Sequence, residues 1–538
     1  AFCLSRGLGD VYKRQLQEVF LSPYFNRRQD RYGGDLDGRL RLLTETLEKV
    51  RAEVAPQLAV GIRFNVDEQL PDGLGIADTR LILDRLIEQD LIQFADLDVA
   101  VEPQQVSQMV APMFMERQHV ARHVREFGPV GRDRIVTMAV GGRVTSVAEA
   151  ERLLAEGVMD MVGAVRELIA EPELLKNARE GREDRSRTCI ASNFCIARLG
   201  SGMWGCLLNP ATGRERRWGV KTLVPGKSRR KVVVVGAGPA GLEAARVAAL
   251  LGHEVLVFEE RAGAGGQINL WAALPQREIL STSVEWYLAR LQELGVRLLT
   301  GVRAGAERVL AERPEAILVA TGSRYDASGL NGFTEKPIPG SGQDFVLTPE
   351  QVIEGGVRPQ GRVLILDCEQ TQVGVGLAHL LGEAGASVEL VTQNLSAVSA
   401  TTSMGGQHEL ILPTLKRLGV RTTVATFVRE IGDHRVRLYD VFTGDEEERE
   451  VDAVVLATMR RSRGELVRSL EGSAAQVFSI GDALAPRGLF EAAYEGQRFA
   501  RLIGEDGAPR TITEALFSPP PAEVFARSAA ALEVEEVV

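Results

Sequence analysis

Hydrophobic positions in the first third of the chain alternate between a spacing typical of helices and short apolar runs typical of strands. Helical spacing recurs in four segments, residues 39–54, 76–89, 111–127 and 146–155. Apolar runs that predict buried strands cover residues 58–65, 94–100, 134–140 and 159–165. Regular alternation of this kind predicts a parallel β-sheet whose strands are joined by helices.

The same alternation resumes after a connector, Arg214 to Lys231, that is rich in Arg, Lys, Gly and Pro. A buried strand at Lys231–Val235 leads into a G-x-G-x-x-G turn made by Gly236, Gly238 and Gly241. A helix follows, and the next strand ends at Glu259. The glycines permit a tight turn and the approach of a pyrophosphate, and the carboxylate suits an unphosphorylated ribose. This unit predicts a dinucleotide site.

Residues 346–458 repeat the strand–turn–helix–strand pattern without its glycines. Asp367 and Glu369 stand in the turn where a pyrophosphate would approach, and Met459 stands where a glycine is usual. The pattern predicts the topology of a nicotinamide domain whose binding turn is lost. Binding of NAD(P)H here remains the alternative interpretation.

Composition excludes several classes of protein. The 538 residues carry a net charge of −10, which argues against nucleic acid or an anionic membrane as the main partner. No apolar run reaches the roughly 18 residues that span a bilayer. Five cysteines do not make a disulfide framework, so we expect a cytoplasmic protein. We expect residues 1–15 to be a non-native leader and residues 518–538 to be a poorly packed tail.

Three of the five cysteines lie close together, at Cys189, Cys195 and Cys206. Ser192 stands midway between the first two, and a cysteine there would complete the spacing of an iron–sulfur site. Serine is a harder ligand than a thiolate, so the replacement changes the donor set. Two interpretations remain open, an altered cluster site and three buried thiols without a metal.

Two turns in the first domain carry arginines directly after strands. Gly142 and Arg143 follow the third strand, and Val165 and Arg166 end the fourth. In (β/α)8 barrels, the loops after the last two strands bind phosphate. The pair of turns therefore predicts a phosphate site. His119 and His123 are four residues apart, and we expect surface or satisfied histidines rather than a metal site.

Long segments of the chain resemble the trimethylamine dehydrogenase / 2,4-dienoyl-CoA reductase branch of the old yellow enzyme family. They are FLSPYFNRRQDRYGGDLDGR (20–39), VGGRVTSVAEAERLLAEGVMDMVGAVRELIAEPEL (140–174) and the cysteine segment with NPATGRE (189–215). FADLDVAVEP and RERRWGV are most similar to the N-methyl-amino-acid demethylases of that branch. The resemblance implies FMN, a [4Fe-4S] cluster, and FAD or ADP. The family's barrel has four further strands before this point, so the chain is expected to be N-terminally truncated.

The resemblance also implies an α/β fold with defined domains. Residues 16–186 would form the C-terminal half of a (β/α)8 FMN barrel, followed by two Rossmann-like nucleotide-binding domains. The remaining boundaries are 187–230 for the iron–sulfur segment and linker, 231–345 with 459–517 for the FAD- or ADP-binding domain, and 346–458 for the NAD(P)-domain-like insert.

Site residues follow from the resemblance position by position. Arg63 would face the flavin, and the two arginine turns would hold the FMN phosphate. The three cysteines, with Ser192 in the fourth place, would ligate iron. The second flavin-contact turn contains Gln267, the crossing between nucleotide domains contains Thr321 and Gly322, and Asp482 would lie by the ribityl chain.

Three functions are compatible with these observations. The first is oxidative N-demethylation of a methylated amine or amino acid, with electrons passed to an electron-transfer flavoprotein or ferredoxin. The second is an NAD(P)H-dependent enoate or dienoyl-CoA reductase, and the third is a non-catalytic nucleotide-binding fragment. No residue is predicted as the catalytic base, and a homodimer is expected.

Overall fold

The computed structural model describes residues 15–101, 105–131, 133–140, 142–199, 204–226 and 228–504. The predicted leader, apart from its last residue, and the predicted tail lie outside these ranges. The chain divides into two compact units. The first contains residues 1–213, 273–283 and 338–457, and the second contains residues 214–272, 284–337 and 458–538.

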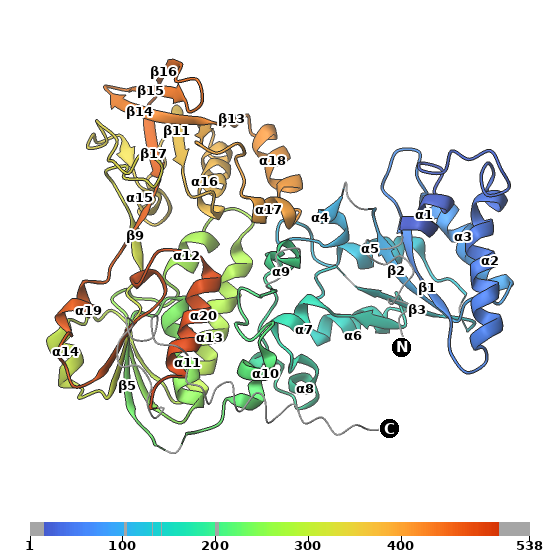
Figure 1. The fold of residues 1–538 in the computed structure, drawn as a ribbon, viewed down its shortest axis with the longest axis horizontal. Coiled ribbons are helices and arrows are strands. Elements are labelled where there is room, and N and C mark those ends of the chain that lie inside the picture. The colour runs from blue at the N-terminus through green and yellow to red at the C-terminus, as the bar shows by residue number, and fades with distance from the viewer. Residues whose placement is uncertain are drawn as a thin grey trace. The chain divides into compact units, whose positions relative to one another are not determined.

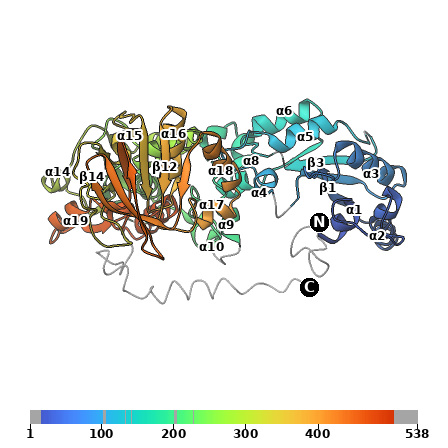
Figure 2. The ribbon, with the colours of Figure 1, turned by 90° about the horizontal axis from the view of Figure 1, so that it is seen from above.

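The first unit begins with a four-stranded parallel sheet in the order β1-β2-β3-β4 (Figure 1). Its strands are β1 (Gly61–Asp67), β2 (Phe94–Val99), β3 (Val136–Val140) and β4 (Met161–Gly163). Its main helices are α1 (Gln15–Leu21), α2 (Leu36–Val54), α3 (Ile76–Glu88), α5 (His119–Phe127) and α6 (Val147–Ala155). Figure 2 shows α5 and α6 along one face of the sheet. The four strands are half of the eight that close a (β/α)8 barrel.

Helix α3 shows how the apolar spacing produces this layer. Ile82, Leu83 and Leu86 are completely buried against the sheet, whose Val66 is equally inaccessible to solvent. Complete burial of each such side chain stabilises the fold by roughly 1.5–3 kcal/mol. The helical period therefore places one face of α3 in the core.

The helix predicted over residues 111–127 is wrong in its first half. Only α5, His119–Phe127, and the single turn α4, Val106–Met109, are helical. Pro112 disfavours helical backbone at the residue before it, which is the first residue of the predicted helix. Gln118 then takes left-handed backbone angles (φ 59°), which sets the start of α5.

Residues 338–457 add a second parallel sheet and an antiparallel one to the first unit. The parallel order is β10 (Val346–Leu347), β17 (Ala453–Ala457), β11 (Arg362–Asp367), β12 (Ser387–Val391) and β13 (Arg421–Thr423). The antiparallel sheet is β14 (Thr426–Gly432), β15 (Arg435–Asp440) and β16 (Glu446–Glu450). Helices α16 (Gln372–Glu383), α17 (Ala400–Met404) and α18 (His408–Arg417) accompany these sheets, and α9 (Phe194–Ala197) belongs to the cysteine segment.

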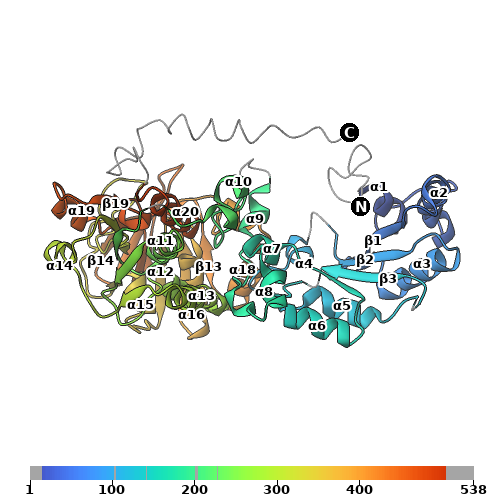
Figure 3. The same ribbon diagram turned by 90° about the horizontal axis from the view of Figure 1, so that it is seen from below.

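The second unit is a parallel Rossmann-like sheet in the order β19-β8-β5-β6-β7. Its strands are β19 (Gln476–Ser479), β8 (Ala316–Val319), β5 (Lys231–Val235), β6 (Glu254–Phe258) and β7 (Arg297–Leu299). Helices α11 (Pro239–Leu250) and α20 (Leu489–Ala500) pack side by side (Figure 3). The crossing strands β9 (Ser323–Tyr325) and β18 (Arg460–Ser462) pair antiparallel beside this sheet. The predicted α/β fold class is confirmed.

Candidate functional site

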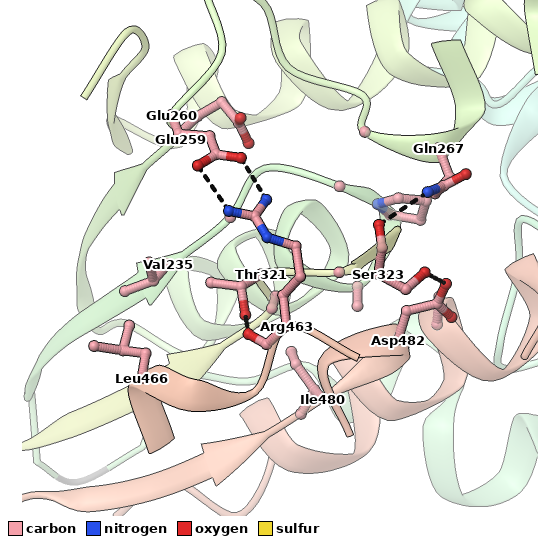
Figure 4. Close-up of a pocket in the computed structure, with 18 of the residues that line it drawn as sticks. Val235, Glu259, Glu260, Gln267, Thr321, Ser323, Arg463, Leu466, Ile480 and Asp482 are labelled. Carbon is pink, nitrogen blue, oxygen red and sulfur yellow. Dashed lines mark hydrogen bonds and ion pairs between the residues drawn. The ribbon is translucent and has the colours of Figure 1, made fainter. Parts of the chain in front are cut away.

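A cavity of about 370 Å³ opens at the carboxyl ends of β5, β6 and β8 (Figure 4). In open parallel sheets, ligands bind beyond the carboxyl ends of the strands. The predicted residues that line the cavity are Gly236, Gly238, Glu259, Gln267, Thr321, Gly322 and Asp482. The structure thus brings together seven residues that are spread over nearly 250 positions of the chain.

The three glycines of the turn have different spatial roles. A Cβ on Gly236, whose φ is 105°, would lie 2.2 Å from the Ala320 carbonyl oxygen. A Cβ on Gly241 would lie 1.9 Å from the Gly236 carbonyl oxygen, so this glycine permits close packing of helix and turn. Gly238 has no atom nearer than 4.0 Å to its Cβ position, and it faces open space at the cavity. That open space suits the approach of a pyrophosphate.

Glu259 is buried and fastens the glycine turn to the end of β6. Its carboxylate accepts hydrogen bonds from the Ala237 N–H (2.7 Å) and the Arg261 N–H (2.8 Å). A carboxylate offers about four acceptor positions, so it can also accept a ribose hydroxyl. Gln267 donates to the Ser323 carbonyl oxygen (3.2 Å), while its own Oε1 is buried without a partner in the described residues.

Asp482 lies at the other end of the cavity and is held by three donors. The Ser323 hydroxyl donates to it at 2.7 Å (Figure 4). The Arg460 guanidinium donates at 2.6 Å and the Arg487 N–H at 3.0 Å. Sequence reasoning missed Ser323 and Arg460, although both directly follow residues named in the two crossing segments. An FAD-type nucleotide fits this cavity. Gly238 leaves open space, the Gln267 Oε1 can accept a hydrogen bond, and the carboxylates of Glu259 and Asp482 lie at its two ends.

In the first unit, the structure brings the two predicted phosphate arginines together. Burial and the neighbouring positive charge of Arg166 together lower the pKa of Arg143 to about 10. Arg143 donates to the carbonyl oxygens of Met113 (3.0 Å) and Met115, and its buried Nε has no partner among the described residues. Arg166 donates to the Ala111 carbonyl oxygen at 2.7 Å. Two neighbouring buried cations with a free donor fit the phosphate of FMN.

The other predicted FMN residues are placed differently. Gly142 has a φ of 61° and accepts a hydrogen bond from the His119 N–H at 3.1 Å. Val165 precedes α7 (Arg166–Ala170) and is 54% exposed. Arg63 donates to Asp98 at 2.5 Å and lies 3.6 Å from Asp96, so its charge is balanced by carboxylates of β2. The roles of these residues toward FMN stay predictions.

The three clustered cysteines are free thiols within one neighbourhood. Burial raises the pKa of Cys189 to about 12 and also raises the pKa values of Cys195 and Cys206. Cys206 is close enough to contribute to the shifts of both other thiols. Among the described residues, no three His, Cys, Asp or Glu side chains are placed to hold one metal ion. The donor set supplies three thiols for a [4Fe-4S] cluster and lacks the fourth.

Sequence reasoning missed the contacts that hold the cysteine segment. Asn193 is 1% exposed, accepts from Arg166 (2.6 Å), and donates to the carbonyl oxygens of Val110 (2.6 Å) and Gly405 (2.9 Å). Gln407 donates to the Ser192 carbonyl oxygen at 2.5 Å. The loop between α17 and α18 therefore binds the cysteine segment directly.

His119 and His123 are buried, so of the two expected alternatives, surface or satisfied histidines, the surface position does not apply. Their rings meet edge to face, with centroids 5.0 Å apart. Burial lowers the pKa of His119 to about 4 and also lowers the pKa of His123. His123 contacts Gln69 through Nε2 (2.9 Å), while its Nδ1 and the Nε2 of His119 are buried without a partner in the described part of the chain.

No helix among the described residues is both long enough and apolar enough to cross a membrane.

Known proteins match both parts of the chain. Residues 15–185 match the NADH:flavin oxidoreductase / NADH oxidase family, and residues 230–484 match the pyridine nucleotide-disulphide oxidoreductase family. The chain is 31% identical to the "Probable N-methylproline demethylase" of Rhizobium meliloti (strain 1021), over 91% of this chain and 75% of that protein. It is also 31% identical to the N,N-dimethylglycine/sarcosine dehydrogenase of Chromohalobacter salexigens, with the same two coverages.

A solved structure agrees with these sequence matches. The 6-hydroxypseudooxynicotine amine oxidase of Pseudomonas geniculata N1 superimposes with a TM-score of 0.84 at 28% identity, over 91% of this chain and 74% of that one. The matched regions include the arginine turns of the first unit and the glycine turn of the second. The chain therefore belongs to the NADH:flavin oxidoreductase / NADH oxidase family and is an FMN-dependent oxidoreductase.

Proposed function

We propose that the protein catalyses the oxidative N-demethylation of a methylated amine or amino acid. The similarity to demethylating and dehydrogenating relatives supports this reaction. The paired cations of Arg143 and Arg166 support it as well, because they would anchor the phosphate of FMN next to the carboxyl ends of the strands. FMN, when bound, accepts two electrons and a proton.

The substrate chemistry is a balanced oxidation followed by hydrolysis. The N-methyl carbon loses a hydride, and the nitrogen lone pair forms a C=N bond, which gives an iminium ion. Water adds to the iminium carbon with loss of a proton, and the C–N bond then breaks to release formaldehyde and the demethylated amine. Asp98 would position the Arg63 guanidinium through its 2.5 Å hydrogen bond.

The single observation that carries the direction of electron flow is the filled turn after β11. Asp367 is 1% exposed, and its carboxyl accepts from the Glu369 N–H (3.1 Å) and the Gln370 N–H (2.9 Å). A Cβ on Gly374 would lie 2.1 Å from its other oxygen. The chain's own carboxyl group thus occupies the place where a nicotinamide dinucleotide would present its pyrophosphate. This geometry favours a protein acceptor over NAD(P)+.

We propose an electron-transfer flavoprotein or ferredoxin as that acceptor. We also propose that Cys189, Cys195 and Cys206 ligate an iron–sulfur cluster whose fourth position is Ser192. The common neighbourhood of the three thiols supports this assignment, and metal binding would have to displace their protons. We further propose that the protein is cytoplasmic, that it forms a homodimer, and that its domains have the boundaries expected from the sequence.

Formaldehyde release tests the proposed reaction. The full chain is incubated with N-methylproline, dimethylglycine, sarcosine or dimethylamine, together with an artificial dye that accepts two electrons. We expect formaldehyde in an amount equal to the dye that is reduced. Dye reduction without formaldehyde, or no turnover of any methylated amine by flavin-loaded protein, would overturn the proposal.

A further inference from the structure

An ion pair joins the two walls of the nucleotide cavity in the second unit. Glu260 follows Glu259 at the end of β6, and Arg463 lies between β18 and α19 (Glu465–Ser469). The Arg463 guanidinium binds both oxygens of the Glu260 carboxylate, once at 2.9 Å and once more closely. Figure 4 shows Arg463 extended from the side of Thr321 toward the end of β6.

The backbone of Arg463 is fixed from both sides, so its side chain starts from a defined place. Its N–H donates to the Gly322 carbonyl oxygen at 2.9 Å, and its carbonyl oxygen accepts from the Thr321 hydroxyl at 2.6 Å. The ion pair lowers the pKa of Glu260 and raises the pKa of Arg463, so both groups are charged at neutral pH. The Arg324 guanidinium is 3.7 Å from the same carboxylate.

This pair stands at the ribose end of the cavity. In dinucleotide folds, the acid at the end of the second strand binds the ribose hydroxyls, and here that acid is Glu259. Where such folds accept a 2′-phosphate, an arginine nearby takes its charge. Arg463 has the position and charge for that role, but its fork of donors is already bound to a carboxylate.

We infer that Glu260 is a specificity residue of this cavity, because it occupies Arg463 and so selects adenosine whose ribose carries no 2′-phosphate. A 2′-phosphate would bring up to two negative charges beside the carboxylates of Glu259 and Glu260, while the Arg463 guanidinium is held by Glu260 and does not balance them. The inference rests on the assignment of an adenine nucleotide to this cavity.

Competition between two small nucleotides tests this inference. The full chain is freed of bound nucleotide, and the dissociation constants of ADP and adenosine 2′,5′-bisphosphate are measured by calorimetry. The wild type is expected to prefer ADP. Glu260→Gln should reduce that preference by about tenfold, because it removes one carboxylate and releases Arg463. Glu285→Gln, on the exposed side of α13 (Ser281–Glu293), should leave the preference unchanged.

Two further variants separate the freed arginine from a general loss of negative charge. In the double variant Glu260→Gln/Arg463→Met, the preference should return toward that of the wild type. In Arg463→Met alone, the preference for ADP should increase, because Glu260 is then left uncompensated. Arg463→Met, which keeps Glu260, also tests the inference if Glu260→Gln proves difficult to fold.

Two outcomes would contradict the inference, and they can be distinguished from each other. If ADP binds every variant and Glu260→Gln keeps the wild-type preference within twofold, the specificity role of Glu260 is overturned while the nucleotide assignment stands. If the wild type binds neither compound, the nucleotide assignment fails, and this inference fails with it.

Discussion

The side-chain amide of Asn193 donates a hydrogen bond to the carbonyl oxygen of Gly405 at 2.9 Å, across 212 positions of sequence. Asn193 also has a φ of 54°, a region that favours glycine and asparagine. One residue therefore joins the cysteine segment to the α17–α18 loop and supplies an unusual backbone conformation at the same position.

Asn193→Gly and Asn193→Ala separate these two roles. Glycine removes the side-chain hydrogen bonds and keeps the backbone angle, so we expect the free energy of unfolding to fall by about 2–4 kcal/mol. Alanine should lose about 1 kcal/mol more, because its Cβ disfavours left-handed angles. Urea denaturation measures both values. Equal stabilities of the two variants, or stabilities near that of the wild type, would contradict this account.

Asp367 predicts an unusual dependence of stability on pH. Burial raises its pKa to about 7, whereas the unfolded chain ionises this group near pH 4. Between those values the folded state binds more protons, so this group's contribution to the free energy of unfolding falls as pH rises from about 4 to 7.

The variant Asp367→Asn removes that titration and keeps an acceptor for the Glu369 and Gln370 N–H groups. We expect it to be more stable than the wild type at pH 8, by about 2–4 kcal/mol, and to lose most of that advantage at pH 5. The exposed Asp433→Asn is the control. A stability difference that is the same at both pH values would refute the assignment.

The glycine turn predicts opposite results for two similar substitutions. Gly238→Ala should fold, because its Cβ meets nothing nearer than 4.0 Å, and should weaken ADP binding on the order of tenfold or more by narrowing the pyrophosphate approach. Gly241→Ala should lower the melting temperature, because its Cβ would lie 1.9 Å from the Gly236 carbonyl oxygen. Thermal unfolding and calorimetry distinguish these outcomes. A stable Gly241→Ala with normal binding would be inconsistent with the turn described above.

Ser192→Cys tests the proposed cluster position. A fourth thiolate should raise the iron and acid-labile sulfide bound per chain and should strengthen the cluster's paramagnetic resonance signal after reduction. Ser192→Ala is the matched control and should bind no more iron than the wild type. Iron-free protein in all three cases, after anaerobic reconstitution, would exclude a cluster in this segment.

Local sequence patterns were sufficient for much of the fold. The alternation of periods predicted β1 to β4 and the Rossmann-like unit, because strand and helix formation there follows the burial of apolar side chains. The glycine turn could also be predicted from the sequence, since a Cβ on Gly236 or Gly241 would meet atoms of the turn itself or of the residues that follow the neighbouring strand. The prediction of a helix before His119 is wrong, because Pro112 and the left-handed backbone of Gln118 outweigh the apolar spacing.

The contacts that sequence reasoning missed join distant segments. Glu260 and Arg463 are 203 positions apart, and neither belongs to the G-x-G-x-x-G pattern. The contact of Gln407 with Ser192 likewise depends on how α17 and α18 pack beside the cysteine segment. Charged residues of this kind look like ordinary surface positions until the tertiary structure pairs them.

Anaerobic reduction of the flavin tests the central claim most directly. The purified full chain, loaded with FMN, is mixed without oxygen with an N-methylated amino acid, with NADH or with NADPH, and the flavin absorbance is followed. We predict bleaching by N-methylproline or dimethylglycine, with about one formaldehyde per flavin, and no bleaching by either nicotinamide. Bleaching by NADH or NADPH, with no response to any methylated amine, would contradict the account and would favour an enoate reductase.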